Sequence, residues 1–200
     1  MLDRTVRRAV EPVTSRVGGR LAGAGVPADA LTLAGLVLGL ASAVAVATTR
    51  WWLGLGLWLA SRVLDGLDGA VARAGSPSDS GAFLDIVSDF TVYGAFVVGV
   101  AAAVPDARLA CAVLLFTYYV NGASLLAYSS LAERRGLAAD DERGVRFLGG
   151  LTEGTETVVV HSLFCVLPAV AVPIAWAFAA AVGLTAVWRT VFAARVLRRS

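Results

Sequence analysis

The chain has 200 residues, of which 58% are hydrophobic and only 16% are charged, and its mean hydropathy is +0.74. Soluble domains carry about 25% charged residues, so this composition excludes an ordinary soluble domain and indicates a membrane protein. The net charge is +2 and all 17 basic residues are arginines. They do not form the basic and aromatic surface that nucleic-acid binding requires, so we expect no nucleic-acid partner.

The first expected element is an amphipathic helix in an N-terminal segment, residues 1–26. Arginines and apolar residues alternate there every three or four positions, which gives a helix one basic and one apolar side. Such a helix lies on an anionic membrane surface. We expect Pro12 to interrupt it. A frayed cytosolic tail is the alternative interpretation of this segment.

Residues 27–200 form the second expected domain, an all-α bundle of six transmembrane helices. Pro27 suits the first turn of a helix, and Gly35 and Gly39 form a small-xxx-small pair that lets another helix approach closely. Residues 75–80 form a turn in which Ser78 to Ser80 are available to cap the third span. The expected spans are residues 31–48, 51–74, 81–104, 109–131, 150–168 and 173–196.

Six spans place both termini on the same side of the membrane. The N-terminal arm, the turn at 75–80, the loop at 132–148 and the C-terminus hold nearly all the loop arginines, whereas the opposite loops offer only Arg50 and Arg108. By the positive-inside rule, the arginine-rich side is cytoplasmic. We therefore expect a multi-pass protein of the cytoplasmic membrane with both termini in the cytoplasm.

Four aspartates lie near the cytoplasmic ends of the second and third spans. Asp65 and Asp68 are three positions apart, and Asp85 and Asp89 are four apart, so each pair lies on one face of its helix. A carboxylate at the centre of a membrane helix costs roughly 2.5–3.5 kcal/mol, so four of them need a compensating role. Only two arginines, Arg62 and Arg73, lie nearby, and all-oxygen ligation suits Mg²⁺ or Mn²⁺. Two such ions roughly 3.5–4 Å apart form a clamp for displacement at phosphorus.

Small residues and one arginine accompany these carboxylates. Gly69 follows Asp65 by four positions and Ala72 follows Asp68 by four, which leaves a groove beside the acids. Arg73 lies one turn after Gly69 and can bind phosphate through a fork of donors. With the metals, this pattern indicates a site for a nucleoside diphosphate that faces the cytoplasm.

The pattern D-x-x-D-G-x-x-A-R followed by G-x-x-x-D-x-x-x-D resembles the signature of the CDP-alcohol phosphotransferases, which are integral membrane enzymes of phospholipid synthesis. The six-span layout extends the resemblance to most of the chain. Residues 27–32 are similar to the family's Pro-Asn-x-Leu-Thr entry to the first span, but with one extra residue and Asp for Asn. Every fixed position of the signature is present, at Asp65, Asp68, Gly69, Ala72, Arg73, Gly81, Asp85 and Asp89.

The resemblance implies transfer of a substituted phosphate from a CDP-linked donor to a hydroxyl, with release of CMP. It implies that Asp89 takes the proton from the attacking hydroxyl. It also implies a homodimer. By the same resemblance, two divalent cations are bound by Asp65, Asp68, Asp85 and Asp89, and the CDP moiety is held by Gly69, Ala72 and Arg73.

The donor in the bacterial branch of the family is usually CDP-diacylglycerol, so we expect transfer of a phosphatidyl group to a small polar alcohol. One alternative is transfer of a phospho-amino-alcohol from its CDP derivative to a lipid alcohol. A second alternative is a membrane cation transporter, since intramembrane acids also line ion pathways. The chain lacks the paired repeats with broken helices that many transporters have.

The acceptor alcohol is left open by the sequence. Cytoplasmic arginines can bind a phosphorylated alcohol or can act only as topology determinants. A polar patch at the start of the fifth span would suit a polyol or an amino alcohol, and it consists of Thr152, Glu153 and Glu156. The alternative is that the two acids pair with Arg189 or Arg146. We expect a packed, non-catalytic His161, free thiols at Cys111 and Cys165, and interhelical hydrogen bonds from Asn121 and Tyr128. The candidate arginines are Arg134, Arg135, Arg143, Arg146 and Arg189.

Overall fold

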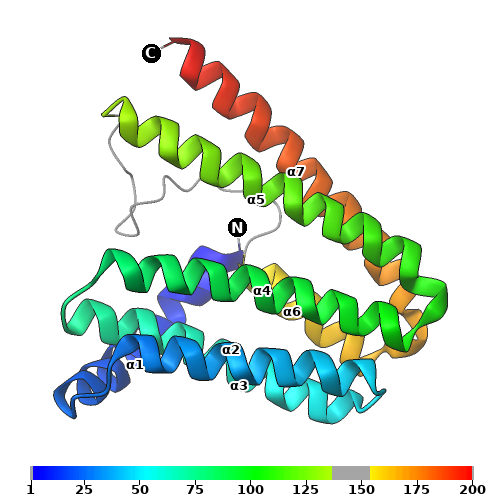
Figure 1. The fold of residues 1–200 in the computed structure, drawn as a ribbon, viewed down its shortest axis with the longest axis horizontal. Coiled ribbons are helices and arrows are strands. Elements are labelled where there is room, and N and C mark those ends of the chain that lie inside the picture. The colour runs from blue at the N-terminus through cyan, green and yellow to red at the C-terminus, as the bar shows by residue number, and fades with distance from the viewer. Residues whose placement is uncertain (1, 137–153, 200) are drawn as a thin grey trace.

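The structure is a computed structural model, and it describes residues 2–136 and 154–199, with side chains described for 10–136 and 154–198. Within these ranges every regular element is helical (Figure 1). The elements are α1 (Leu2–Gly23), α2 (Ala28–Ala47), α3 (Trp51–Ala74), α4 (Asp79–Ala103), the 3-10 turn η1 (Pro105–Ala107), α5 (Arg108–Arg134), α6 (Gly154–Val166), the 3-10 turn η2 (Pro168–Val170) and α7 (Ala171–Arg199).

The helices agree with the prediction of an all-α membrane protein. Four stretches are long and apolar enough to cross a membrane. The predicted second span corresponds to α3, which has 24 residues but contains two arginines and two aspartates. The predicted fifth span corresponds to α6, of which 13 residues are described. These two spans, and therefore the six-span topology, stay predictions. The four stretches are Ala28–Ala47, Asp79–Ala103, Pro105–Arg134 and Pro168–Arg198.

Local signals mark the starts of α4 and α2. Ser78 caps α4, because its Oγ accepts a hydrogen bond from the Gly81 N–H at 3.0 Å, as predicted. Pro27 lies one position earlier than predicted, as the N-cap of α2. The predicted interruption at Pro12 is wrong, because α1 continues through this residue. A proline removes one backbone hydrogen bond, which bends a helix as readily as it ends one. The position of α1 on a membrane surface stays a prediction.

Close packing of α2 against α3 and α4 forms the most compact part of the bundle. The Ser61 hydroxyl of α3 donates to the Gly35 carbonyl of α2 at 2.7 Å. A methyl group at Gly39 would overlap the Val92 side chain of α4, and one at Gly99 would overlap the α2 backbone. The small-xxx-small prediction for Gly35 and Gly39 is therefore confirmed, since both glycines permit close approach.

The aromatic core lies where α3, α4 and α6 meet. Trp58, Phe96 and His161 are fully buried, and the Phe96 and His161 rings stack with centroids 4.6 Å apart. His161 is packed, as predicted. The free thiols of Cys111 and Cys165 are also buried, as predicted. Helices α5 and α7 lie side by side and diverge from α4 toward the C-terminal end of both (Figure 1).

The contact at Gly39 predicts a matched pair of stability effects. Gly39→Ala should lower the free energy of unfolding by about 1–3 kcal/mol, because the methyl group overpacks the contact with Val92. Gly56→Ala, at an exposed helical position with open space around it, should leave stability unchanged or raise it. Thermal unfolding of both variants in the same detergent measures the difference. An equal effect of the two substitutions would contradict the close packing at Gly39.

Candidate metal centre

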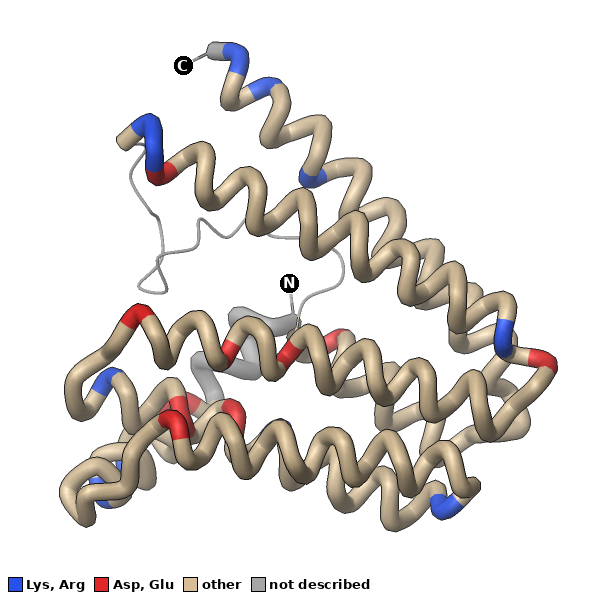
Figure 2. Tube along the Cα trace, in the orientation of Figure 1, with Lys and Arg blue, Asp and Glu red and all other residues tan. Residues whose placement is uncertain are grey.

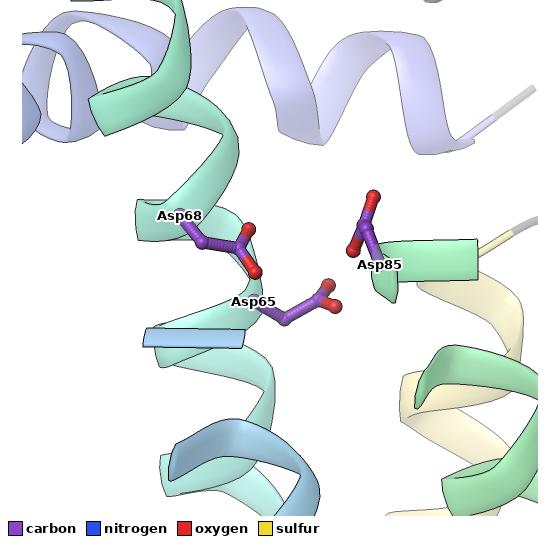
Figure 3. Close-up of side chains that lie close together, drawn as sticks. All are labelled: Asp65, Asp68 and Asp85. Carbon is purple, nitrogen blue, oxygen red and sulfur yellow. The ribbon is translucent and has the colours of Figure 1, made fainter. Parts of the chain in front are cut away.

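Three of the four predicted metal ligands converge between α3 and α4. One carboxylate oxygen from each of Asp65, Asp68 and Asp85 lies within 4.8 Å of the others. Figure 3 shows the three carboxylates pointing into the space between the two helices, two from α3 and one from α4. The two α3 aspartates share a face because they are three positions apart. The C-terminal half of α3 and the N-terminal half of α4 thus carry one acidic cluster (Figure 2).

Two hydrogen bonds fix the orientation of Asp68 within this cluster. Its side chain is buried, with 4% of the residue exposed. The Thr32 hydroxyl of α2 donates to Asp68 Oδ2 at 2.6 Å, and the Gly69 N–H donates to Asp68 Oδ1 at 2.6 Å. Each carboxylate oxygen has more than one acceptor site, so these bonds fix the orientation and leave capacity for a cation. Sequence reasoning missed this role of Thr32, although it noted the segment that contains the residue.

Asp89, the fourth predicted ligand, lies one helical turn after Asp85 and has a different partner. Arg62 Nη1 is 2.5 Å from Asp89 Oδ1, in a charge-assisted hydrogen bond. The same nitrogen is 3.6 Å from Asp65 Oδ1. The second oxygen of Asp89 accepts a long hydrogen bond, 3.5 Å, from the Tyr93 hydroxyl. Arg62 therefore links Asp89 to Asp65, because the same nitrogen lies close to both carboxylates.

Arg62 is enclosed by the helices that carry the acids. Only 8% of its side chain is exposed, and its Cζ lies 5.1 Å from the ring centroids of both Trp58 and Tyr93. Nη2 donates to Ser61 Oγ at 3.0 Å and Nη1 donates to the Tyr93 hydroxyl at 3.2 Å. Sequence reasoning counted this arginine only as a nearby base. Because Arg62 lies three residues before Asp65, the sequence indicated that both side chains lie on the same face of the helix.

The donor set fits divalent cations. Four carboxylates and one buried guanidinium occupy this part of α3 and α4, so negative charge is in excess among the described side chains. Carboxylate oxygens are ligands that Mg²⁺ and Mn²⁺ prefer. A purely structural network would leave that charge uncompensated inside an apolar bundle, which is costly.

The predicted nucleotide-binding residues follow directly on α3. The Arg73 guanidinium folds back along the helix, so that a methyl group built on Gly69 would lie 3.2 Å from Arg73 Nη1. Arg73 is exposed and Ala72 is partly buried. Ala70, which follows Gly69 in the sequence, packs against Gly18 of α1. The Arg73 guanidinium is therefore exposed on the same helix that carries Asp65 and Asp68.

The described candidate acceptor residues lie on or next to α5, α6 and α7. Arg189 is 3% exposed, and its Nη1 donates to Asn121 Oδ1 at 3.1 Å, which confirms the predicted interhelical role of Asn121. The Tyr128 hydroxyl is buried, and among the described residues it has no hydrogen-bond partner, so its predicted interhelical bond is not found. Arg135 bonds to the Leu197 carbonyl. Outside the described residues lie Arg143, Arg146, Thr152 and Glu153.

Known proteins resemble this chain in sequence. A model of the CDP-alcohol phosphatidyltransferase family matches residues 26–192. Inner membrane protein YnjF of Escherichia coli is 37% identical over 172 residues, which is 84% of each chain. Archaetidylinositol phosphate synthase of Methanothermobacter thermautotrophicus is 28% identical over 156 residues, or 78% of this chain and 70% of the relative.

Solved structures share the fold. The phosphatidylinositol phosphate synthase of Mycobacterium tuberculosis with CDP-DAG bound has a TM-score of 0.69 at 23% identity, covering 89% of this chain and 92% of that chain. The complex of the same enzyme with manganese and citrate has a TM-score of 0.70 at 23% identity, and the match covers 90% of this chain and 88% of that chain. At this identity the likeness concerns the fold. The family match spans most of the sequence, and this membrane phosphotransferase belongs to the CDP-alcohol phosphatidyltransferase family.

Proposed function

We propose that this enzyme transfers a phosphatidyl group from CDP-diacylglycerol to the hydroxyl of a small polar alcohol and releases CMP. The observation that carries the proposal is the convergence of the Asp65, Asp68 and Asp85 carboxylates within 4.8 Å. Structures of the same fold with CDP-DAG and with manganese support it. Membership of a transferase family leaves the cation-transporter alternative without support.

The four aspartates are proposed to hold two divalent cations, Mg²⁺ or Mn²⁺. Asp65, Asp68 and Asp85 supply one group of ligands, and Asp89 extends the centre along α4. When bound, these ions supply Lewis-acid stabilisation of the charge that develops on the transferred phosphate. The Thr32 hydroxyl contributes by holding Asp68 in one orientation.

Asp89 is the proposed general base. Its Oδ1 is held by Arg62, its Oδ2 accepts a long bond of 3.5 Å from the Tyr93 hydroxyl, and 29% of its side chain is exposed. Oδ2 is therefore the oxygen available to take the proton of the acceptor hydroxyl. As that proton leaves, the acceptor oxygen bonds to the phosphatidyl phosphorus, and the bond from that phosphorus to the CMP oxygen breaks.

Gly69, Ala72 and Arg73 are proposed to bind the CDP part of the donor. Small side chains at the first two positions leave space beside the helix, and the Arg73 guanidinium provides paired donors for a phosphate. We place this site, and both termini, on the cytoplasmic side of the membrane from the distribution of arginines. A homodimer is the proposed assembly, by family resemblance.

An acceptor screen tests the proposed reaction. Membranes that contain the enzyme should release CMP from CDP-diacylglycerol with Mg²⁺ or Mn²⁺ when the right alcohol is present. Because two similar proteins are named as inositol phosphate synthases, polyol phosphates belong in the screen beside glycerol phosphate, free polyols and amino alcohols. Release of CMP from a CDP-amino-alcohol with a lipid alcohol, and none from CDP-diacylglycerol, would instead establish the reverse arrangement of donor and acceptor.

Loss of the proposed base should stop the reaction. Asp89→Asn should lower the rate of CMP release at least about 100-fold, because the amide cannot accept the proton. Asp106→Asn, an exposed acid in η1 near the other end of α4, should retain the full rate. Both variants should be expressed and should unfold at the same temperature as the unaltered protein. Full activity of Asp89→Asn would show that another group takes the proton.

The contact between Thr32 and Asp68 predicts a change in metal dependence. Thr32→Val keeps the shape of the side chain and removes the donor, so the metal concentration for half-maximal activity should rise about 10–100-fold. The rate at saturating metal should change less. Thr91→Val is the matched control, because the Thr91 hydroxyl donates to the Val87 carbonyl of its own helix. An unchanged metal dependence in Thr32→Val would contradict the positioning role.

A further inference from the structure

Each oxygen of the Asp89 carboxylate has a hydrogen-bond donor beside it. Arg62 Nη1, on α3, lies 2.5 Å from Oδ1, and the Tyr93 hydroxyl, one turn further along α4, donates to Oδ2 at 3.5 Å. The same hydroxyl accepts a hydrogen bond from Arg62 Nη1 at 3.2 Å. The three side chains therefore form a closed ring of contacts, which restricts rotation of the carboxylate.

The guanidinium of Arg62 is itself fixed by contacts with other helices. Its Nη2 donates to Ser61 Oγ at 3.0 Å, and this hydroxyl donates in turn to the Gly35 carbonyl of α2 at 2.7 Å. The ring centroids of Trp58 and Tyr93 lie 5.1 Å from its Cζ. Trp58 is fully buried, and its indole N–H donates to a backbone carbonyl of α6 at 3.3 Å. A guanidinium held in this way loses several contacts when it moves, so its position is well defined.

Arg62 contacts the two nearby carboxylates in different ways. Its Nη1 is 2.5 Å from Asp89 Oδ1 but 3.6 Å from Asp65 Oδ1, and the longer distance is that of an ion pair without a hydrogen bond. The hydrogen-bond partners of this nitrogen are Asp89 and the Tyr93 hydroxyl. Arg62 therefore acts on Asp65 through its charge, whereas it holds Asp89 by a directed bond.

We propose that Arg62 is a positioning residue for the transfer reaction and that it acts through Asp89. It holds Oδ1 from α3 and, together with Tyr93, keeps Oδ2 in one orientation for the proton of the acceptor hydroxyl. A carboxylate that can turn presents this oxygen correctly for only part of the time, and a misplacement of about 1 Å can lower a rate about 100-fold. The inference rests on the proposed role of Asp89 as the general base, and it is independent of the number of cations bound.

Steady-state kinetics of Arg62→Met test the positioning role, because methionine retains apolar contact with the rings and removes the donors. At saturating metal, kcat for CMP release should fall at least about 30-fold, whereas KM for CDP-diacylglycerol should change less than about threefold. Arg50→Met is the matched control, since Arg50 is exposed at the N-cap of the same helix, and it should retain both constants. An unchanged kcat, or a loss confined to KM, would overturn the inference.

Tyr93→Phe keeps the proposal testable if Arg62→Met does not fold. It preserves the ring and removes one hydrogen bond from Arg62 and one from Asp89. It should lower kcat about 3–10-fold, the effect of losing a single hydrogen bond, and leave KM for the donor unchanged. An unaltered kcat in this variant would contradict the role of the ring of contacts.

A double substitution separates action through Asp89 from action through Asp65. In an Asp89→Asn background, with the residual rate followed by release of labelled CMP, Arg62→Met should lower that rate less than about threefold. The reason is that the group positioned by Arg62 is already absent, so the two effects are not additive. An equal loss of about 30-fold in both backgrounds would show that Arg62 acts independently of Asp89, and would overturn the inference.

A crystal structure of Arg62→Met, compared with the unaltered protein in the same crystals, supplies a readout besides activity. The Asp89 carboxylate should turn to a second orientation, while the Asp68 carboxylate, held by Thr32 and Gly69, should stay in place. An Asp89 carboxylate that keeps its orientation would overturn the positioning role and leave the proposed function intact. No CMP release by the unaltered protein with any acceptor would instead overturn the proposed function, and this inference with it. The two failures are therefore distinguishable.

Discussion

The separation between α2, α3 and α4 controls where the carboxylates can meet. Gly39 and Gly99 bring α2 close to α4, and the bond from Ser61 to the Gly35 carbonyl joins α2 to α3. At this separation the Thr32 hydroxyl on α2 reaches Asp68 on α3. Close packing of small residues is how helices associate inside a membrane, where burial of apolar surface provides little driving force. The same packing that holds the bundle together thus sets the spacing of the acidic cluster.

The same packing determines how the negative charges of the four aspartates are compensated. Asp68 is almost completely buried and is satisfied by two hydrogen bonds, whereas Asp65 and Asp89 are about 30% exposed at the side chain and share Arg62. One guanidinium cannot balance four carboxylates, and ionised groups inside a membrane protein are tolerated when they are paired or when they serve an ion. Residual negative charge of this kind favours divalent cations, which is the basis of the proposed metal centre.

Much of this arrangement was predictable because it depends on spacing within single helices. The two aspartate pairs, the Ser78 cap and the bounds of α3 follow from local periodicity and turn chemistry. The roles of Thr32 and Arg62 depend on how one helix is rotated against another, and one sequence does not specify that rotation. Pro12 shows the opposite error, since a local rule predicted a break in a helix that continues. The placement of α1 and of the predicted second and fifth spans in the membrane stays a prediction.

The proposed donor site lies in a short stretch of α3 and α4, while the described candidate acceptor residues lie on or next to α5, α6 and α7. The most direct test of the central claim is an anomalous difference map from crystals of this protein soaked with Mn²⁺ and CDP-diacylglycerol. The account predicts a manganese peak among Asp65, Asp68 and Asp85, with the diphosphate beside it and within reach of Arg73. A bound donor with no manganese at these carboxylates would contradict it.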